Sequence, residues 1–250
     1  VPCATLFRSR RSFEAGSVVN PEYYAADPAS LLIEPHGGSL VHREALAMVT
    51  EADTQLIRVR VSDLALVDCQ QIALGTFSPL TGFMGSATLE SVLNTHCLPD
   101  CTGWTLPITL QIGRGALGKA GVGDRVALEN KGGTIHAVLD ISEIYPVDFA
   151  NTAQPWFGTD SVDHPGVAML AGGGDVFVAG AVTLVRRLAS EYRDFELSPA
   201  QTRFLFTRKG WSRVVGFHTR NVAHRVHDHI QLEALEKAWA DRQEDGTRLN

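Results

Sequence analysis

The residues most able to do chemistry lie between positions 218 and 227. The tetrapeptide HTRN at 218–221 is followed by two further histidines, His224 and His227. Arg220 carries a planar, permanently charged donor fork that suits sulfate or phosphate oxygens. His224 and His227 are three residues apart, so on a helix both would project from one face. The pattern indicates an anion site that supplies positive donors, as phosphoryl-group chemistry requires when two anionic reactants must be held in line.

Simpler interpretations of the same residues stay open. An arginine at the start of a helix is often only a surface charge. The two histidines could face solvent, or they could form half of a zinc site with Asp228 or His229. Zinc would then need further ligands from elsewhere in the chain, and no second HxxH or CxxC pattern supplies them.

Two elements are expected to position this segment. Residues 213–217 (RVVGF) form a short apolar run, typical of a strand buried on both sides of a parallel sheet. Asn221 can cap a following helix over Val222–Asp241, whose first backbone N–H groups would attract an anion. The helix would carry one apolar stripe at i+3/i+4 spacing, composed of Ala223, Val226, Ile230, Ala234 and Ala238.

A further helix is expected upstream, because Ser198 and Pro199 are a typical cap and first helical residue. It would run through Phe206. Helix, strand, tight loop and long helix together are the opening of a doubly wound α/β domain, in which ligands bind outside the carboxyl ends of the strands.

The preceding part of the chain, 31–190, has a different sequence pattern and is expected to form a mainly β domain with some helix. Its β-branched or alternating runs, separated by glycine turns, predict strands of a small barrel. The expected strands are Gln55–Val61, Leu106–Ile112, Arg125–Leu128, Thr134–Ile141, Val176–Ala179 and Ala181–Leu184. Helices are expected at Arg43–Glu51 and Thr88–Asn94. Residues 1–30 are expected to form a loose extension, with a start that need not be native because Val1 replaces Met.

Composition argues against several classes of protein. The 250 residues are 44% hydrophobic and 20% charged, with a net charge of −6 and a sequence pI near 5.8. No basic cluster longer than Arg8–Arg11 occurs, so we expect no nucleic-acid partner. No apolar run of eighteen residues occurs, so we expect no membrane span.

The cysteines favour a reducing compartment. The four thiols are too scattered for a disulfide framework, although Cys97 and Cys101, four residues apart, could form a bridge or half a metal site. Free thiols in the cytosol are the favoured interpretation, and we expect a cytoplasmic protein.

The motifs, taken in series, resemble ATP sulfurylases (sulfate adenylyltransferases). That family carries a Gln-Thr-Arg-Asn tetrapeptide after a buried strand, followed by two histidines spaced as here. The matching positions are Thr219, Arg220, Asn221, His224, Arg225 and His227. Other family-like segments occur in family order, namely 35–38 (PHGG), 75–84 (GTFSPLTGFM), Trp104 with 107–110 (PITL), 158–167 (GTDSVDHPGV), 198–203 (SPAQTR) and 210–211 (GW).

The resemblance implies a PUA-like N-terminal domain over 31–190 and a Rossmann-like nucleotidyltransferase domain over 191–250. It implies attack by a sulfate oxygen on the α-phosphorus of ATP, which gives adenosine 5′-phosphosulfate and pyrophosphate, with Mg²⁺ accompanying the nucleotide and with homo-oligomers. Arg220 would grip sulfate, and Thr219 and Asn221 would position the reacting phosphate. His224 and His227 would donate to the ATP phosphates, while His218 would contact the anion.

The chain departs from the family in three places. His218 stands where the family has Gln, and an imidazole cannot both donate and accept as an amide does. Val222-Ala223 replaces Pro-Met. Nothing in 232–250 resembles the family's glycine-rich GRDHAG-like segment that contacts nucleotide. We therefore expect the catalytic domain to be incomplete within these 250 residues, with little or no catalysis by them alone.

Two functions of other classes remain as alternatives. One is a non-catalytic PUA-like binding module with an RNA or protein partner, against which the acidic balance argues in the case of RNA. The other is a metal-binding regulatory fragment built on His224, His227 and His229.

Overall fold

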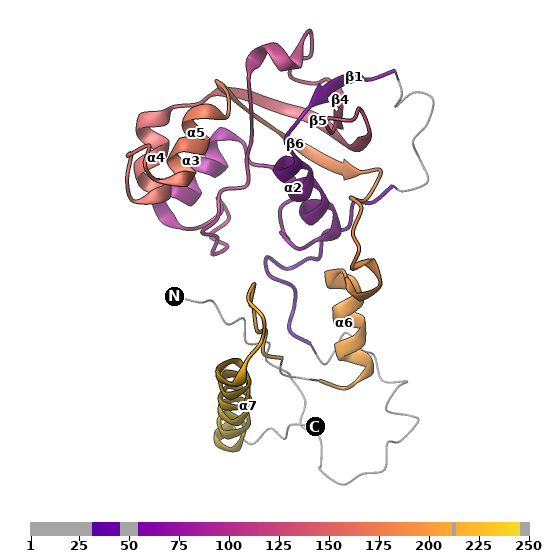
Figure 1. The fold of residues 1–250 in the computed structure, drawn as a ribbon, viewed down its shortest axis with the longest axis vertical. Helices are drawn as coiled ribbons and strands as arrows, with labels where there is room; N and C mark the ends of the chain where they lie inside the picture. Colours follow the sequence, from indigo (N-terminus) through magenta and orange to yellow (C-terminus); the bar gives the residue numbers. More distant parts are fainter. Residues whose placement is uncertain (1–31, 46–54, 212–213, 246–250) are drawn as a thin grey trace. The chain divides into compact units, whose positions relative to one another are not determined.

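A computed structural model of the chain describes residues 32–45, 55–211 and 214–245 (Figure 1). The chain divides into two compact units. The first unit is Pro35–Ser198, and the second consists of the residues on both sides of it. The expected extension over 1–30 lies outside the described residues.

The first unit is built on a six-stranded mixed sheet. Its order is β1-β4-β5-β6-β2, and β3 also pairs with β6. β1 and β4 run parallel, whereas the other pairings are antiparallel. The strands are β1 (Ile57–Arg60), β2 (Gly82–Phe83), β3 (Leu110–Ile112), β4 (Arg125–Glu129), β5 (Ile135–Pro146) and β6 (Val176–Leu184). The expected strands are thus present, with shifted ends.

One expectation about the strands is wrong. The runs Val176–Ala179 and Ala181–Leu184 were expected to be separate, but β6 continues through Gly180. Gly180 has φ +155°, and a Cβ there would lie 2.0 Å from the carbonyl oxygen of Asp140 on β5. The glycine therefore permits close contact at the register shift between Ile141 and Glu143, rather than ending the strand.

Four α-helices accompany the sheet in the described part of the first unit. They are α2 (Asp63–Leu74), α3 (Ser86–Thr95), α4 (Phe149–Phe157) and α5 (Pro165–Gly172). Of these, only α3 was expected. The helix expected over Arg43–Glu51 lies mainly outside the described residues, and its described start is not helical. Glu44 forms an isolated parallel bridge with Leu184, so the backbone there pairs with β6 instead.

Helix α2 has clear local signals at both ends. The Ser62 side chain accepts a hydrogen bond from the backbone N–H of Ala65, which satisfies one free donor of the first turn. Gly75 ends the helix in the left-handed conformation, with φ +89°. The helix packs beside the sheet (Figure 1) and buries Leu66, Cys69 and other side chains against it.

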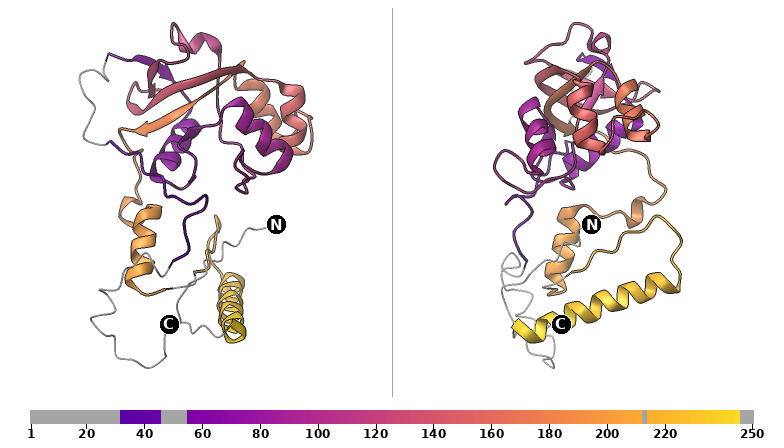
Figure 2. Two further views of the ribbon diagram at one scale, coloured as in Figure 1. Left: turned by 180° about the vertical axis from the view of Figure 1, so that it is seen from behind. Right: turned by 90° about the vertical axis from the view of Figure 1, so that its left-hand side faces the viewer.

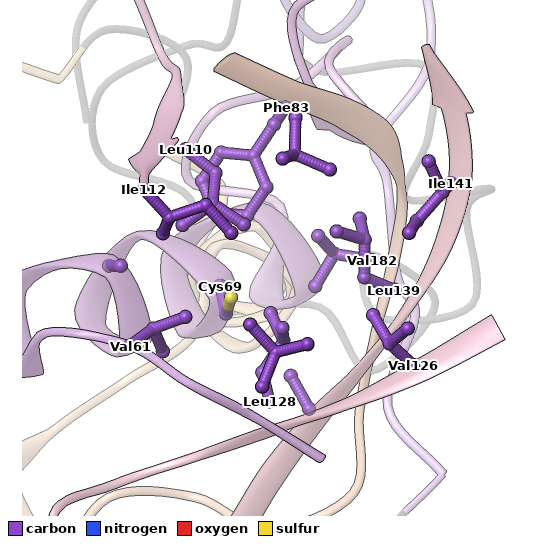
Figure 3. Close-up of a cluster of buried hydrophobic side chains, with 14 of the residues drawn as sticks. Val61, Cys69, Phe83, Leu110, Ile112, Val126, Leu128, Leu139, Ile141 and Val182 are labelled. Atoms are coloured by element: carbon purple, nitrogen blue, oxygen red, sulfur yellow. The ribbon is translucent and has the colours of Figure 1, made fainter. Parts of the chain in front are cut away.

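The main core lies between α2 and the sheet. Figure 3 shows Cys69 of α2 among apolar side chains contributed by several strands. The labelled members of this cluster are Val61, Cys69, Phe83, Leu110, Ile112, Val126, Leu128, Leu139, Ile141 and Val182. Burial of these side chains is the main source of the unit's stability, because removal of apolar area from water is the dominant favourable term in folding.

A second, smaller core holds α3, α4 and α5 together beside the sheet (Figure 2). Val167 of α5 and Ala153 of α4 are completely buried there, next to Phe177 of β6. α5 begins at Pro165 and is capped by His164, whose Nδ1 accepts from the backbone N–H of Gly166. Residues 164–166, whose sequence is typical of a turn, are therefore the start of a helix.

The second unit contains two helices in its described part. α6 spans Pro199–Arg208, which confirms the helix expected after Ser198. Arg203 of this helix donates from Nη2 to the carbonyl oxygen of Ile33, at 2.8 Å. α7 spans Arg225–Asp245. Across the described residues, no helix is both long and apolar enough to cross a membrane.

Candidate functional site

The segment that precedes α7 carries the residues with the expected chemistry, but its elements differ from the expectation. Residues 214–217 form no strand, and Arg213 lies outside the described residues. Val215 and Phe217 are 40% and 37% exposed, so the expected double-sided burial is wrong. A single strand is not stable without neighbours to satisfy its backbone groups, and no described residue of this unit supplies one.

A tight turn presents Arg220. The Thr219 hydroxyl accepts from the backbone N–H of Asn221, at 3.1 Å, and also lies 3.2 Å from the Asn221 carbonyl oxygen. Such Ser/Thr turns hold the backbone outside a helix. Arg220 is therefore at the tip of the turn, exposed, and no described residue pairs with its guanidinium. A free planar fork with five N–H donors is available to an oxyanion.

His224, rather than Asn221, caps the long helix. The backbone N–H of Val226 donates to His224 Nδ1, at 3.3 Å, and the N–H of His227 donates to the His224 carbonyl oxygen, at 2.7 Å. The helix thus begins at Arg225, three residues later than expected, because the turn at Thr219–Asn221 takes up the preceding residues.

The same bonds orient the two imidazoles. His227 Nδ1 accepts from the backbone N–H of His224, at 3.1 Å, so both rings use Nδ1 as an acceptor. A neutral imidazole that accepts at Nδ1 carries its proton at Nε2. The ring centroids are 3.9 Å apart, and the His227 ring also meets Phe217 edge-on at 5.7 Å. Two Nε2–H donors are therefore presented side by side.

The structure brings some of the expected site residues together and leaves others apart. The bonded groups are Thr219 with Asn221, and His224 with His227. His218 makes no recorded bond to any other described residue of the group. The expected site residues are residues 218–221, His224 and His227. All of them are solvent-exposed except His227, which is half-buried.

The described residues do not support a metal centre in this segment. No group of three or more His, Cys, Asp or Glu side chains is gathered there or elsewhere in the described ranges. His229, the third member of the metal-binding alternative, lies 3.8 Å from Glu233, one turn along α7. Among the described residues, the His224 and His227 imidazoles instead accept hydrogen bonds from backbone N–H groups at the start of α7.

One polar residue was missed by reasoning from the sequence alone. Asp68 of α2 lines a groove in the first unit, and burial raises its pKa to about 6. The available signal was a carboxylate within the apolar run 64–74, LALVDCQQIAL. This carboxylate indicates a site only once residues 64–74 are known to form a helix, because only then is it clear which face carries Asp68.

Comparisons with known proteins agree with the segments described above. The family model for a PUA-like domain matches residues 33–187, which is more than half of the chain, and the model for ATP-sulfurylase matches residues 193–242. A sulfate adenylyltransferase of Acaryochloris marina is 39% identical over 210 residues, and one of Symbiobacterium thermophilum is 40% identical over 208 residues. The chain therefore has a PUA-like domain over 33–187, followed by a segment that matches the ATP-sulfurylase family.

The match to these ATP sulfurylases covers 82% of this chain but only 54% and 53% of the two relatives. The chain thus spans about half the length of the curated relatives it matches. Among solved structures, one described as a hexameric APS kinase from Thiobacillus denitrificans is 25% identical, with a TM-score of 0.63 over 85% of this chain and 38% of that one. This likeness agrees with the PUA-like fold of the first unit.

Proposed function

We propose that this chain carries the PUA-like domain and the sulfate-binding segment of a sulfate adenylyltransferase. The reaction is attack by a sulfate oxygen on the α-phosphorus of ATP. A new P–O bond forms, the bond from the α-phosphorus to the bridging oxygen breaks, and pyrophosphate leaves with that oxygen. The products are adenosine 5′-phosphosulfate and pyrophosphate.

The observation that carries the proposal is the exposed guanidinium of Arg220, which pairs with no described residue and lies within the residues matched by the ATP-sulfurylase family model. Arg220 binds sulfate through its donor fork. Thr219 and Asn221 hold the turn that presents this arginine, and they position the reacting phosphate. His218 provides a further N–H donor to the anion.

His224 and His227 donate from Nε2 to the ATP phosphates, because their Nδ1 atoms already accept from the backbone. Donors that are in place before the reaction stabilise charge that develops on phosphate oxygens. They are not required as general bases, since sulfate has no proton to lose at neutral pH.

Mg²⁺ enters as part of the nucleotide substrate. The described residues offer no cluster of acidic ligands, so phosphate oxygens and water would complete its coordination. The proposal also includes a cytoplasmic location, supported by the three free thiols among the described residues, and self-association into a homo-oligomer.

The test is pyrophosphate release by the complete gene product that contains these 250 residues. We expect release to require ATP and sulfate together, and Arg220→Ala to lower kcat/KM by about 10²–10³-fold. Arg114→Ala is the control, because Arg114 is exposed and its side chain has no partner among the described residues. An unchanged rate in Arg220→Ala would remove the sulfate site from this turn.

The 250-residue chain alone is expected to release little or no pyrophosphate, since it spans about half of its relatives. If the complete product also lacks activity with both substrates present, the non-catalytic binding module becomes the better interpretation. The Arg220→Ala variant therefore tests where the sulfate site lies, and the activity of the complete product tests the proposed function itself.

A further inference from the structure

A groove of about 360 Å³ lies in the PUA-like unit, with one wall from α2, one from the segment before β3, and one from α4 and α5. The lining residues with polar side chains are Ser62, Asp68, Thr109 and Gln111, and the others are apolar or glycine. None of the residues of the proposed sulfate site takes part in this lining. The groove is therefore a feature that the adenylyl-transfer proposal leaves unexplained.

Three of the segments that carry the family resemblance meet in this groove. Phe77 comes from 75–84, Pro107 and its neighbours come from 107–110, and Gly166 comes from 158–167. Segments that are distant in the sequence thus line the same groove. Its volume and its mostly apolar lining are typical of pockets for small molecules.

Gly166 has a specific place in the aromatic wall. A Cβ at this position would lie 2.5 Å from Cε1 of Phe157, so only glycine lets that ring pack against the start of α5. The ring of Phe157 is stacked on Trp156, with centroids 5.0 Å apart and an interplanar angle of 7°. Two nearly parallel, stacked aromatic rings therefore form one side of the groove.

Among the described residues that line the groove, only Asp68 is charged. It is on the same face of α2 as Leu64, four residues earlier. No described residue donates a hydrogen bond to its carboxylate or pairs with it. Removal from water is the cause that raises its pKa to about 6. A carboxylate in this position lacks a partner that proteins normally supply.

The chemistry of the groove selects among possible ligands. A negative charge in apolar surroundings repels nucleotides, sulfate and other anions. A single carboxylate is too few ligands for a metal ion. An ammonium or guanidinium group would pair with the Asp68 carboxylate through charge-assisted hydrogen bonds. The apolar remainder of the lining requires an apolar body attached to that cation.

We propose that this groove binds a small organic cation, an amine or guanidine on an apolar body, with the Asp68 carboxylate as its counter-ion. The aromatic wall at Trp156 and Phe157 covers the apolar part of the ligand. Leu64 and Met169, 55% and 61% exposed, lie at the rim.

The probe is 2-phenylethylamine, and its uncharged analogue 2-phenylethanol is the reference. Both are titrated into the 250-residue chain at pH 7.5, and binding is followed by ¹H–¹⁵N NMR, including the indole N–H of Trp156. We expect saturable shifts at groove residues with the amine, and binding of the alcohol weaker by about tenfold or more.

Asp68→Asn keeps the shape of the side chain and removes the charge. It should weaken amine binding by about tenfold or more, to the level of the alcohol, whereas Asp63→Asn should leave it unchanged. Asp63 is the matched control, because it is an exposed aspartate in the first turn of the same helix and does not line the groove. Equal binding of the amine to wild type and Asp68→Asn would overturn the proposal.

A second measurement needs no variant. Between pH 7.5 and pH 5 the amine stays charged while Asp68 takes up a proton, so its affinity for the amine should fall across this range. No other described residue that lines the groove is charged, and affinity for the alcohol should not change. Amine affinity independent of pH, or the absence of shifts at Trp156, would equally overturn the proposal.

Discussion

Arg187 binds Glu44 through two parallel hydrogen bonds, Nε to Oε1 at 2.5 Å and Nη2 to Oε2 at 2.6 Å. The pair joins the first and last parts of the PUA-like unit, where the backbone around Glu44 also pairs with Leu184 of β6. The two side chains differ in exposure, at 7% for Glu44 and 29% for Arg187. The hydrogen bonds to Glu44 are the main cause that raises the pKa of Arg187.

This asymmetry predicts the effect of breaking the pair. Arg187→Met leaves the buried Glu44 carboxylate with only the exposed His42 beside it, at 4.0 Å, and should cost about 2–3 kcal/mol of unfolding free energy. Glu44→Met should cost less, because Arg187 can turn its head group to water. The double variant should return to within about 1 kcal/mol of wild type, and urea denaturation measures all three. Additive losses would show that the pair is not coupled.

At Gly82, the addition of a single methyl group should lower the unfolding free energy. A Cβ at Gly82 would lie 1.8 Å from the carbonyl oxygen of Gly180, a backbone atom that cannot move without breaking the pairing of β2 with β6. Gly82→Ala should therefore cost about 3 kcal/mol or more in unfolding free energy. Gly103→Ala is the control, because a Cβ there meets nothing within 4 Å. Similar melting temperatures for both variants would contradict the close approach.

The strands of the PUA-like unit could be predicted from sequence because local periodicity carries the signal. β4 is an apolar run between glycine turns, and its predicted and observed bounds differ by one residue. Helix α2 could not, since its residues are apolar on several faces and give no clear 3.6-residue period. Helix α4 contains Pro155, which normally argues against a helix interior. Tertiary packing overrides that local signal.

The candidate sites, too, could be predicted from sequence only as far as local patterns reach. The sequence identified the tetrapeptide at 218–221 and the two histidines, because chemical type and spacing are visible without a fold. It could not show that His224 caps α7, since the choice between Asn221 and His224 depends on backbone geometry at Thr219. The groove around Asp68 is assembled from segments up to about a hundred residues apart, and no local pattern reports such an assembly.

The thiols should differ sharply in reactivity. Cys69 is completely buried, and removal from water, together with the charge of Asp68, raises its pKa. Cys101 is exposed. With iodoacetamide at pH 8, Cys101 should be alkylated at least about a hundredfold faster than Cys69, because only the thiolate reacts and Cys69 needs an opening of the core. Peptide mass spectrometry gives both rates, and comparable rates in the folded chain would contradict the burial of Cys69. In guanidinium chloride the difference should disappear.

His218 should contribute a hydrogen-bond donor rather than a special reactivity. In the complete gene product, His218→Gln keeps an N–H donor and should leave KM for sulfate within about threefold, whereas His218→Ala should raise it about five- to tenfold. KM for ATP should change less in both variants. His229→Ala is the control, since His229 lies beside Glu233 on α7. A loss in His218→Gln as large as in His218→Ala would show that imidazole itself is required.

The raised pKa of Asp68 predicts that its contribution to the stability of the folded chain falls as pH rises, which is the opposite of the usual case for an aspartate. Burial raises its pKa to about 6 in the folded chain, above the value of about 4 in the unfolded chain. The folded state therefore binds the proton more tightly, and this group's contribution to stability falls as pH rises from about 4 to about 6. Asp68→Asn removes that contribution, so the variant should be as stable as wild type near pH 4 and more stable at pH 7.

Because Asp68 is partly exposed, we expect a difference at pH 7 on the order of 0.5 M in the urea midpoint. Asp63→Asn should show no such gain, and a variant less stable than wild type at pH 7 would mean that the Asp68 carboxylate has a stabilising partner in the folded chain.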